Sequence, residues 1–255
     1  MGVIALIQVL CLYILYGYAG TEDIIGGKEV LRHSMPYMAF VQDSSSDNKV
    51  YRCGGVLISD DYVLTAAHCK TANMKVILGA HNIMVKEDTQ EINVCNAIPH
   101  PQYQGSFEHD IMLLKLMKKA VINRYVLPLP TDNSNSNVKP GKICTVAGWG
   151  VLNTYNDKLS ELLRGVHLTV VDNKVCSTYF PKLNVADFIC AGDVNENKVT
   201  GKGDSGGPLL CGVNLSGIVF GGKKNKKPPT LFTKVAPYKT WIKNTMKKEK
   251  CNFFA

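Results

Sequence analysis

One short run of the sequence sets a serine among glycines, an arrangement that suits nucleophilic catalysis. Residues 201–208 read Gly-Lys-Gly-Asp-Ser-Gly-Gly-Pro, and the serine is Ser205. Backbone N–H groups of such glycines can face a developing negative charge, so the run predicts a nucleophile beside an oxyanion hole. A serine hydroxyl is a weak nucleophile at neutral pH. A general base, and a carboxylate that orients this base, are therefore also expected.

Candidates for both partners occur upstream of this serine. His68 stands in Leu-Thr-Ala-Ala-His-Cys at residues 64–69, and Asp110 stands in His-Asp-Ile-Met-Leu-Leu at residues 109–114. With these contexts and the chain order His68, Asp110, Ser205, the sequence resembles the chymotrypsin family of serine proteases. Further segments extend the resemblance over most of the chain: Ile-Ile-Gly-Gly at 24–27, Cys-Gly-Gly at 53–55 and Cys-Thr-Val-Ala-Gly-Trp-Gly at 144–150.

The resemblance assigns roles to these groups. His68 is expected to take the hydroxyl proton of Ser205 during attack on a peptide carbonyl and to return it to the leaving amine, while Asp110 fixes the imidazole tautomer. The N–H groups of Gly203 and Ser205 are expected to bind the oxyanion of the transition state. The implied activity is that of a serine endopeptidase that works through an acyl-enzyme, without a cofactor or a metal.

The elements that must position these groups have the pattern of an all-β protein. Short alternating or apolar runs are separated by clusters of Gly, Asn, Asp and Ser, as in strands joined by turns. The resemblance implies two six-stranded antiparallel β-barrels with the site in the cleft between them. Residues 127–139 are rich in Pro, Asn and Ser and are expected to link barrels at about 24–130 and about 138–250. Residues at helical spacing from Tyr238 to Met246 predict a C-terminal helix.

The N-terminal segment has the features of a secretory signal. Residues 1–20 carry no charge and contain an apolar run at residues 3–16. This run is too short and too near the start to predict a membrane span, so we interpret residues 1–19 as a signal peptide, with cleavage as late as residue 21. Residues 20–23 would then be an activation peptide and residues 24–255 the protease domain. The expected location is outside the cell or in a secretory granule.

Activation in this family implies that Ile24 becomes the N-terminus and that its ammonium pairs with Asp204, which orders the oxyanion loop. The preceding residue is Asp23, where a trypsin-like activator would need Lys or Arg. Signal removal after Ala19 or Thr21 leaves an even number of residues, which a dipeptidyl peptidase can remove in pairs. The arrangement is similar to that of granzymes and of mast-cell or neutrophil granule proteases.

The residues just before the nucleophile indicate both the subgroup of proteases and the substrate preference. Residues 199–202 lack the cysteine that often precedes the Gly-Asp-Ser core, as is common in granule proteases. By alignment, the primary pocket is formed by Val199, Thr200, Gly222 and Thr230. None of these side chains is charged, so we predict cleavage after apolar residues of medium to large size. Lys202 borders the oxyanion residue and either favours acidic groups on the leaving side or is a solvated lysine.

One departure from the family pattern affects the expected rate of catalysis. Where the family usually has a serine and an aromatic residue after Gly-Ile-Val, this chain has Phe220 and Gly221. Phenylalanine has no hydroxyl, so Asp110 is expected to lose one hydrogen bond, a contact worth about 1–3 kcal/mol when one partner is charged. The alternative to a competent protease is a weakly active or inactive basic granule protein that binds heparin-like polymers or microbial surfaces.

Removal of Cys11 with the signal peptide leaves an even number of cysteines, which suits disulfides in an oxidising compartment. The resemblance implies three bonds: Cys53–Cys69, Cys144–Cys211 and Cys176–Cys190. Cys95 and Cys251 remain. They pair with each other, or one stays available for an intermolecular bond, or both are inert thiols.

The chain has a net positive charge. Lysine and arginine exceed aspartate and glutamate by 29 to 21, and loss of Glu22 and Asp23 would raise the formal charge from +8 to +10. Lysine clusters at residues 223–227 and 247–250 suit a sulfated glycosaminoglycan, or they are solvated faces. The expected partners are protein or peptide substrates, without nucleic acid or a membrane, and we expect a monomer. Calcium is not expected, because Ala80 stands where calcium-binding relatives supply a carboxylate. Asn214 begins a glycosylation sequon.

Overall fold

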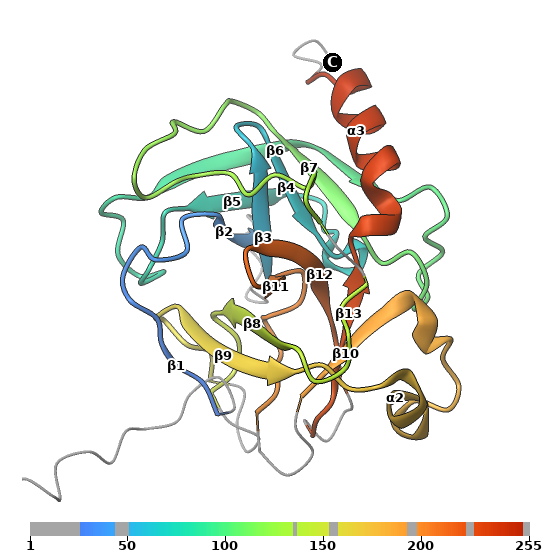
Figure 1. The fold of residues 1–255 in the computed structure, drawn as a ribbon. Coiled ribbons are helices and arrows are strands. Elements are labelled where there is room, and N and C mark those ends of the chain that lie inside the picture. Colours follow the sequence, from blue (N-terminus) through green and yellow to red (C-terminus); the bar gives the residue numbers. More distant parts are fainter. Residues whose placement is uncertain are drawn as a thin grey trace, which may run out of the picture.

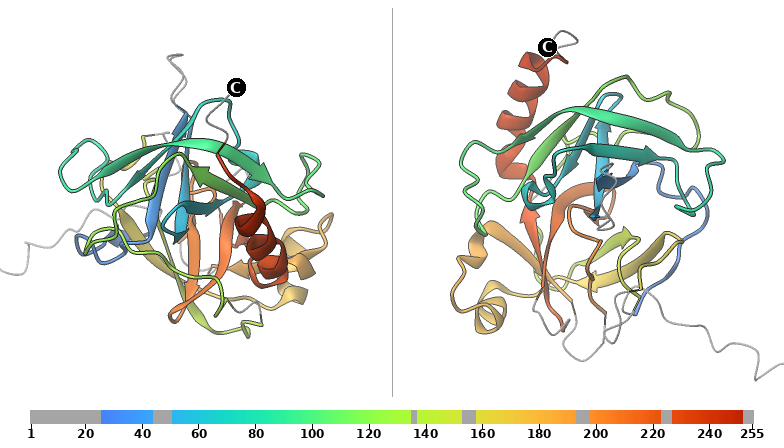
Figure 2. Two further views of the ribbon diagram at one scale, coloured as in Figure 1. Left: turned by 90° about the horizontal axis from the view of Figure 1, so that it is seen from above. Right: turned by 180° about the vertical axis from the view of Figure 1, so that it is seen from behind.

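The computed structural model describes residues 26–43, 51–134, 137–152, 158–192, 198–222 and 227–251. Ile24, the predicted signal and activation peptides, and most of the lysine cluster at 223–227 lie outside these ranges. Within them the chain forms two β units that lie side by side, and one long helix runs along the first unit (Figures 1 and 2).

The first unit is a closed barrel of six antiparallel strands in the order β2-β3-β4-β7-β6-β5. The strands are β2 (Met38–Asp43), β3 (Arg52–Ser59), β4 (Tyr62–Thr65), β5 (Met74–Leu78), β6 (Gln90–Pro99) and β7 (Met112–Leu116). Leu57, Val63 and Leu114 are among the fully buried side chains that fill it. Thr65 at the end of β4 pairs with Met112 at the start of β7. The segments after β4 and before β7 therefore leave the barrel at the same rim.

The second unit is a curled antiparallel sheet in the order β1-β9-β8-β11-β12-β13-β10. Its strands are β1 (Lys28–Glu29), β8 (Ile143–Gly148), β9 (Arg164–Thr169), β10 (Phe188–Ala191), β11 (Pro208–Cys211), β12 (Asn214–Gly221) and β13 (Thr230–Lys234). An isolated bridge between Val170 and Ala191 joins β9 to β10 and brings the two ends of the curl together. The prediction of two β-barrels is confirmed, with β1 as an additional strand on the edge of the second.

The predicted C-terminal helix is confirmed as α3 (Lys239–Lys248), which follows the short helix η3 (Ala236–Tyr238). Ile242 is buried against the first barrel with Ile58 and Leu64, and Trp241 and Met246 pack at its edge. Because these apolar residues recur on one face, the helix covers the barrel and leaves its lysines outside. A second helix, α2 (Asn173–Tyr179), precedes η2 (Val185–Asp187) and β10. No helix in the described ranges is long and apolar enough to cross a membrane.

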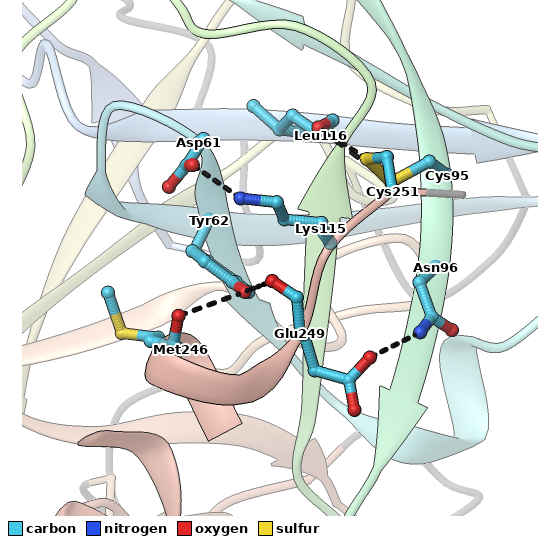
Figure 3. The surroundings of a disulfide bond; sticks show 9 residues. All are labelled: Asp61, Tyr62, Cys95, Asn96, Lys115, Leu116, Met246, Glu249 and Cys251. Carbon is cyan, nitrogen blue, oxygen red and sulfur yellow. Dashed lines mark hydrogen bonds and ion pairs between the residues drawn. A yellow bond between two sulfur atoms is a disulfide. The ribbon is translucent and has the colours of Figure 1, made fainter. Parts of the chain in front are cut away.

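Four disulfides cross-link the described residues. Three of them are Cys53–Cys69, Cys144–Cys211 and Cys176–Cys190. The fourth joins Cys95 to Cys251, the two cysteines for which the sequence left several outcomes open. It ties the segment after α3 to strand β6 of the first barrel (Figure 3).

Polar contacts reinforce this tether (Figure 3). Asn96 Nδ2 donates to Glu249 Oε2 at 2.8 Å, next to the disulfide on β6. The hydroxyl of Tyr62 on β4 lies 3.3 Å from the carbonyl oxygen of Glu249 and 3.4 Å from that of Met246. The end of α3 is thus held to two strands of the first barrel at once.

Candidate active site

His68 and Asp110 meet at the barrel rim where β4 ends and β7 begins. His68 lies in the short helix η1 (Ala67–Cys69), which the Cys53–Cys69 disulfide ties to β3. Asp110 Oδ2 is 2.6 Å from His68 Nδ1, and Oδ1 accepts the backbone N–H of His68 at 2.8 Å. Asp110 is fully buried, whereas 29% of the His68 side chain is exposed. Such a carboxylate favours hydrogen on Nδ1 and leaves Nε2 as a base.

Ser205 reaches this rim from the second unit, on the loop before β11. The loop is fixed to both units: Ser205 O accepts from Gly54 N in β3, and Gly206 N donates to Val219 O in β12, both at 2.8 Å. Gly206 has a φ of +80°, and a Cβ there would lie 2.1 Å from Thr65 Oγ1 and 2.6 Å from Gly54 O. Only glycine allows this close approach of the loop to the first barrel.

The groups expected to react with substrate have no competing partner among the described residues. Neither the Ser205 hydroxyl nor the backbone N–H groups of Gly203 and Ser205 donate a hydrogen bond there. Gly203 has a φ of +99°, and a Cβ on it would meet Leu159 Cδ2 at 2.9 Å. The two N–H groups are therefore available to an oxyanion, and the serine hydroxyl is available to a base.

Asp204, next to the nucleophile, is a buried carboxylate held by backbone amides. It is 1% exposed, and its two oxygens accept the N–H groups of Gly150 and Gly201, each at 2.8 Å. Burial raises the pKa of Asp204 to about 6, and these hydrogen bonds oppose the rise. No side-chain cation among the described residues forms a salt bridge with Asp204. The predicted partner, the ammonium of Ile24, lies outside them.

The residues aligned with a primary pocket cluster behind the loop. Val199, Thr200 and Thr230 are all buried. The Thr200 hydroxyl lies 3.2 Å from Thr230 Oγ1, so the two hydroxyl groups satisfy each other. A Cβ on Gly222 would make only ordinary van der Waals contacts, with Pro229 O nearest at 3.7 Å. These four residues supply no charge.

Phe220 does not contact Asp110 through a polar group, in agreement with its lack of a hydroxyl. In the part of the chain that the structure describes, the two hydrogen bonds to the Asp110 carboxylate both come from His68. The Phe220 ring lies edge-on to the His68 ring at 6.1 Å between centroids, and it also contacts the rings of Phe107 at 5.6 Å and Phe188 at 5.4 Å. An aromatic contact thus stands where the sequence predicted the loss of a hydrogen bond.

Some residues at the site were missed by sequence reasoning. The hydroxyl of Tyr51 donates to the carbonyl oxygen of His68 at 3.1 Å. Phe107, 51% exposed, presents its ring beside Phe220. Tyr51 lies two residues before the Cys-Gly-Gly segment at 53–55, and Phe107 shortly precedes Asp110. Their closeness to those motifs in the sequence was the signal that could have pointed to these residues.

A metal site is not supported by the described residues that lie near His68. The sulfur atoms of Cys53 and Cys69 and a ring nitrogen of His68 lie within 4.8 Å of one another, but the two sulfur atoms are joined in a disulfide. A disulfide offers no thiolate, and thiolate is the form in which cysteine binds metals.

Comparisons with known proteins agree with this geometry. The family model described as Trypsin matches residues 24–242. Granzyme F of Mus musculus is 47% identical over 90% of this chain and 93% of its own length. Cathepsin G of Homo sapiens is 44% identical over 90% of this chain and 89% of its own. A solved structure described as "Structure of GrC" has 45% sequence identity and aligns with a TM-score of 0.82, covering 88% of this chain and 100% of the other.

Proposed function

This chain belongs to the trypsin family and is a serine endopeptidase related to granzymes and cathepsin G, and we propose that His68, Asp110 and Ser205 are its catalytic triad. The observation that carries the proposal is the contact of 2.6 Å between Asp110 Oδ2 and His68 Nδ1, beside a serine on a glycine-rich loop. His68 takes the proton of Ser205 as the hydroxyl attacks a peptide carbonyl. The same proton then passes to the leaving amine, and water hydrolyses the acyl-enzyme by the reverse sequence.

The oxyanion of each tetrahedral intermediate is bound by the N–H groups of Gly203 and Ser205. These donors lack partners among the described residues, so no hydrogen bond must break before they bind. Their interaction strengthens as the carbonyl oxygen gains charge, which lowers the barrier more than it stabilises bound substrate.

Maturation follows the chain order of the segments. A signal peptide at residues 1–19, or as far as 21, is removed on secretion, and an activation peptide at 20–23 is removed afterwards in pairs of residues. The protease domain then begins at Ile24, whose ammonium pairs with buried Asp204. We assign the mature enzyme, residues 24–255, to secretion or storage in a granule as a monomer.

The substrate preference rests on the four pocket residues. Because Val199, Thr200, Gly222 and Thr230 carry no charge and the two threonine hydroxyls bond to each other, the pocket suits an apolar side chain. Cleavage of a peptide library by the mature chain tests this preference. Efficient cleavage after arginine would refute it.

Covalent labelling tests the nucleophile. A fluorophosphonate probe should label the chain that begins at Ile24 and should not label its Ser205→Ala variant. Ser177→Ala, a change in α2 outside the site, is the matched control and should be labelled like the parent. Absence of labelling in a folded and correctly processed parent would contradict the proposed function.

A second candidate function, binding of sulfated polymers, is favoured by the lysines of α3. Lys239, Lys243 and Lys247 are spaced four residues apart and line a groove of about 540 Å³ between α3 and residues 130–132. Residues at this spacing share one helix face. Salt elution from immobilised heparin tests this function, with Ser205→Ala as the protein so that proteolysis plays no part. Elution of the Lys243→Gln/Lys247→Gln variant at the same salt concentration as the parent would exclude this groove.

A further inference from the structure

A cluster of aromatic side chains lies directly beside the turn that carries Asp110. It is formed by His100, which follows β6, by His109, and by Tyr238 of η3 and Trp241 of α3. The His100 ring stacks on the His109 ring, with 5.0 Å between centroids and 24° between planes. The rings of Tyr238 and Trp241 lie edge-on to His100, each at 5.0 Å. Segments that are far apart in the sequence therefore meet next to the triad carboxylate.

One polar contact within this cluster joins the C-terminal segment to the first barrel. The hydroxyl of Tyr238 lies 3.1 Å from Nδ1 of His109. Burial raises the pKa of Tyr238 to about 12, so its hydroxyl is protonated at neutral pH and can donate to that nitrogen. The two rings also meet edge-on, at 6.0 Å and 89°. His109 is thus held by a hydrogen bond and by the rings of two neighbours.

The backbone of His109 needs such support. Its φ is +56°, in the left-handed region that a residue with a side chain rarely occupies. A backbone conformation of this kind persists where the surroundings hold it in place. Ile111 N donates to His109 O at 2.7 Å, which closes a tight turn around Asp110. A rotation of the backbone at His109 would therefore move Asp110 with it.

The carboxylate of Asp110 tolerates little movement. It is fully buried, and its two oxygens make the contacts of 2.6 Å and 2.8 Å with Nδ1 and the backbone N–H of His68. Hydrogen bonds weaken as their distance and angle depart from the optimum. A small displacement of the turn would therefore loosen the imidazole that acts as the base.

We propose that His109 is a positioning residue for the triad, held in its left-handed conformation by Tyr238 and His100 so that Asp110 faces His68. The inference rests on the proposed function, because it concerns how the triad of that same site is held. His109 acts through Asp110 and not on the substrate. The C-terminal segment, which follows the last strand of the second unit, thereby helps to align a group of the first barrel.

The variant Tyr238→Phe tests the proposal, because it keeps the ring and removes only the hydroxyl. We expect kcat to decrease about fivefold with KM unchanged, since a misaligned base slows the chemical step without altering substrate binding. The matched control is Tyr62→Phe, which removes a hydroxyl that contacts the other end of α3. It should leave kcat and KM unchanged. Titration of Ser205 with a fluorophosphonate gives the concentration of active enzyme.

The proton between His68 and Asp110 provides a second readout. A proton in so short a hydrogen bond to a carboxylate resonates at low field in an NMR spectrum, apart from other signals. In proteins that begin at Ile24 and carry Ser205→Ala, we expect Tyr238→Phe to shift or broaden this resonance and Tyr62→Phe to leave it in place. A merely structural role of Tyr238 would not move it.

Two substitutions of His109 separate its backbone from its ring. His109→Asn and His109→Ala both remove the ring, but asparagine adopts the left-handed region more readily than alanine. We therefore expect His109→Asn to keep the higher kcat. Equal kcat in these two variants would overturn the inference.

Other outcomes would overturn the inference and leave the proposed function intact. One is a Tyr238→Phe variant with the kcat and the low-field resonance of the parent. Another is an equal loss of kcat in Tyr62→Phe, which would trace the effect to general anchoring of α3. Failure of the parent to cleave any peptide would instead reject the proposed function, and the inference with it.

Discussion

Among single residues, Phe220 has the clearest effect on how the triad is held. Its ring packs on His68, Phe107 and Phe188, while among the described residues Asp110 receives hydrogen bonds only from His68. A hydroxyl at position 220 would give the buried carboxylate a further donor. The packing of His68 on an aromatic ring would be lost in exchange. Since a hydrogen bond to a charged group contributes about 1–3 kcal/mol and ring contacts about 0.5–1.5 kcal/mol, the hydroxyl outweighs the ring.

We therefore expect Phe220→Ser to raise kcat by about fivefold, a change of roughly 1 kcal/mol in the barrier. The measurement is kcat on a peptide with an apolar residue before the scissile bond. Phe220→Ala removes the ring without adding a hydroxyl and should lower kcat. If the serine and alanine variants gain equally, relief of crowding by the ring is the cause, and the hydrogen-bond account is wrong.

A second residue-scale prediction concerns Gly206. A Cβ at this position would collide with Thr65 Oγ1 and Gly54 O, in addition to occupying a left-handed backbone. Gly212 has a similar φ of +72°, but a Cβ there meets nothing within 4 Å. We expect Gly212→Ala to cost about 1–2 kcal/mol of unfolding free energy and to keep activity. Gly206→Ala should cost more and abolish probe labelling, because Ser205 moves with its neighbour. Equal costs in denaturant unfolding would show that the contact with the first barrel is unimportant.

At the scale of elements, the Cys95–Cys251 bond fixes α3 to the barrel that it covers. The bond closes a loop with a sequence separation of 156 residues, so its removal gives the unfolded chain considerable freedom. We expect Cys95→Ala/Cys251→Ala to lower the unfolding free energy by about 2–4 kcal/mol and the Tm by roughly 5–15 °C. Thermal unfolding measures the change. Activity below the transition should be kept, since Asn96 and Tyr62 still hold the end of α3. An unchanged Tm would mean that these polar contacts alone carry the tether.

The sequence predicted elements whose signal is local. Short apolar runs predicted the strands, helical spacing predicted α3, and the contexts of His68, Asp110 and Ser205 predicted candidate reactive groups. The pairing of Cys95 with Cys251 was not predictable, because connectivity depends on which chain segments meet in space. A hollow beside Ser205, lined by Arg52 of the first unit and Leu159 of the second, was not predicted for the same reason, since its walls come from both units. The edge strand β1 has only two residues, too few for a periodic pattern.

At the scale of the whole molecule, the two units are joined at the active site by buried groups around the Ser205 loop. Asp204 is the most sensitive of these groups, because its carboxylate is buried beside the nucleophile and no cation among the described residues pairs with it. Gly148 and Gly150 surround it so closely that a Cβ on either would lie within 2.4 Å of its oxygens. There is consequently no room for a side chain to neutralise it from this direction. A chain terminus freed at Ile24 could supply the charge without adding such a side chain.

This arrangement predicts that stability depends on pH differently before and after processing. In the unprocessed chain burial raises the pKa of Asp204 from 3.8 to about 6. The folded state then binds a proton more tightly than the unfolded state, so this stabilisation is fully present below pH 3.8 and is lost as pH rises through about 6. The loss amounts to about 3 kcal/mol at neutral pH. After processing, an ammonium beside Asp204 would lower its pKa and remove the loss.

The experiment compares a chain that begins at Gly20 with one that begins at Ile24, both carrying Ser205→Ala to prevent self-cleavage. Denaturant unfolding from pH 4 to pH 7 gives the free energy of each. The other titrating side chains are shared except Glu22 and Asp23 of the activation peptide, and a longer chain with Glu22→Gln/Asp23→Asn removes that difference, so that the two curves then differ through Asp204 and its partner. We expect the unprocessed chain to lose stability relative to the processed chain as pH rises over this range. Parallel curves would contradict the pairing of Ile24 with Asp204, because an added ammonium that leaves the titration of Asp204 unchanged does not lie beside it.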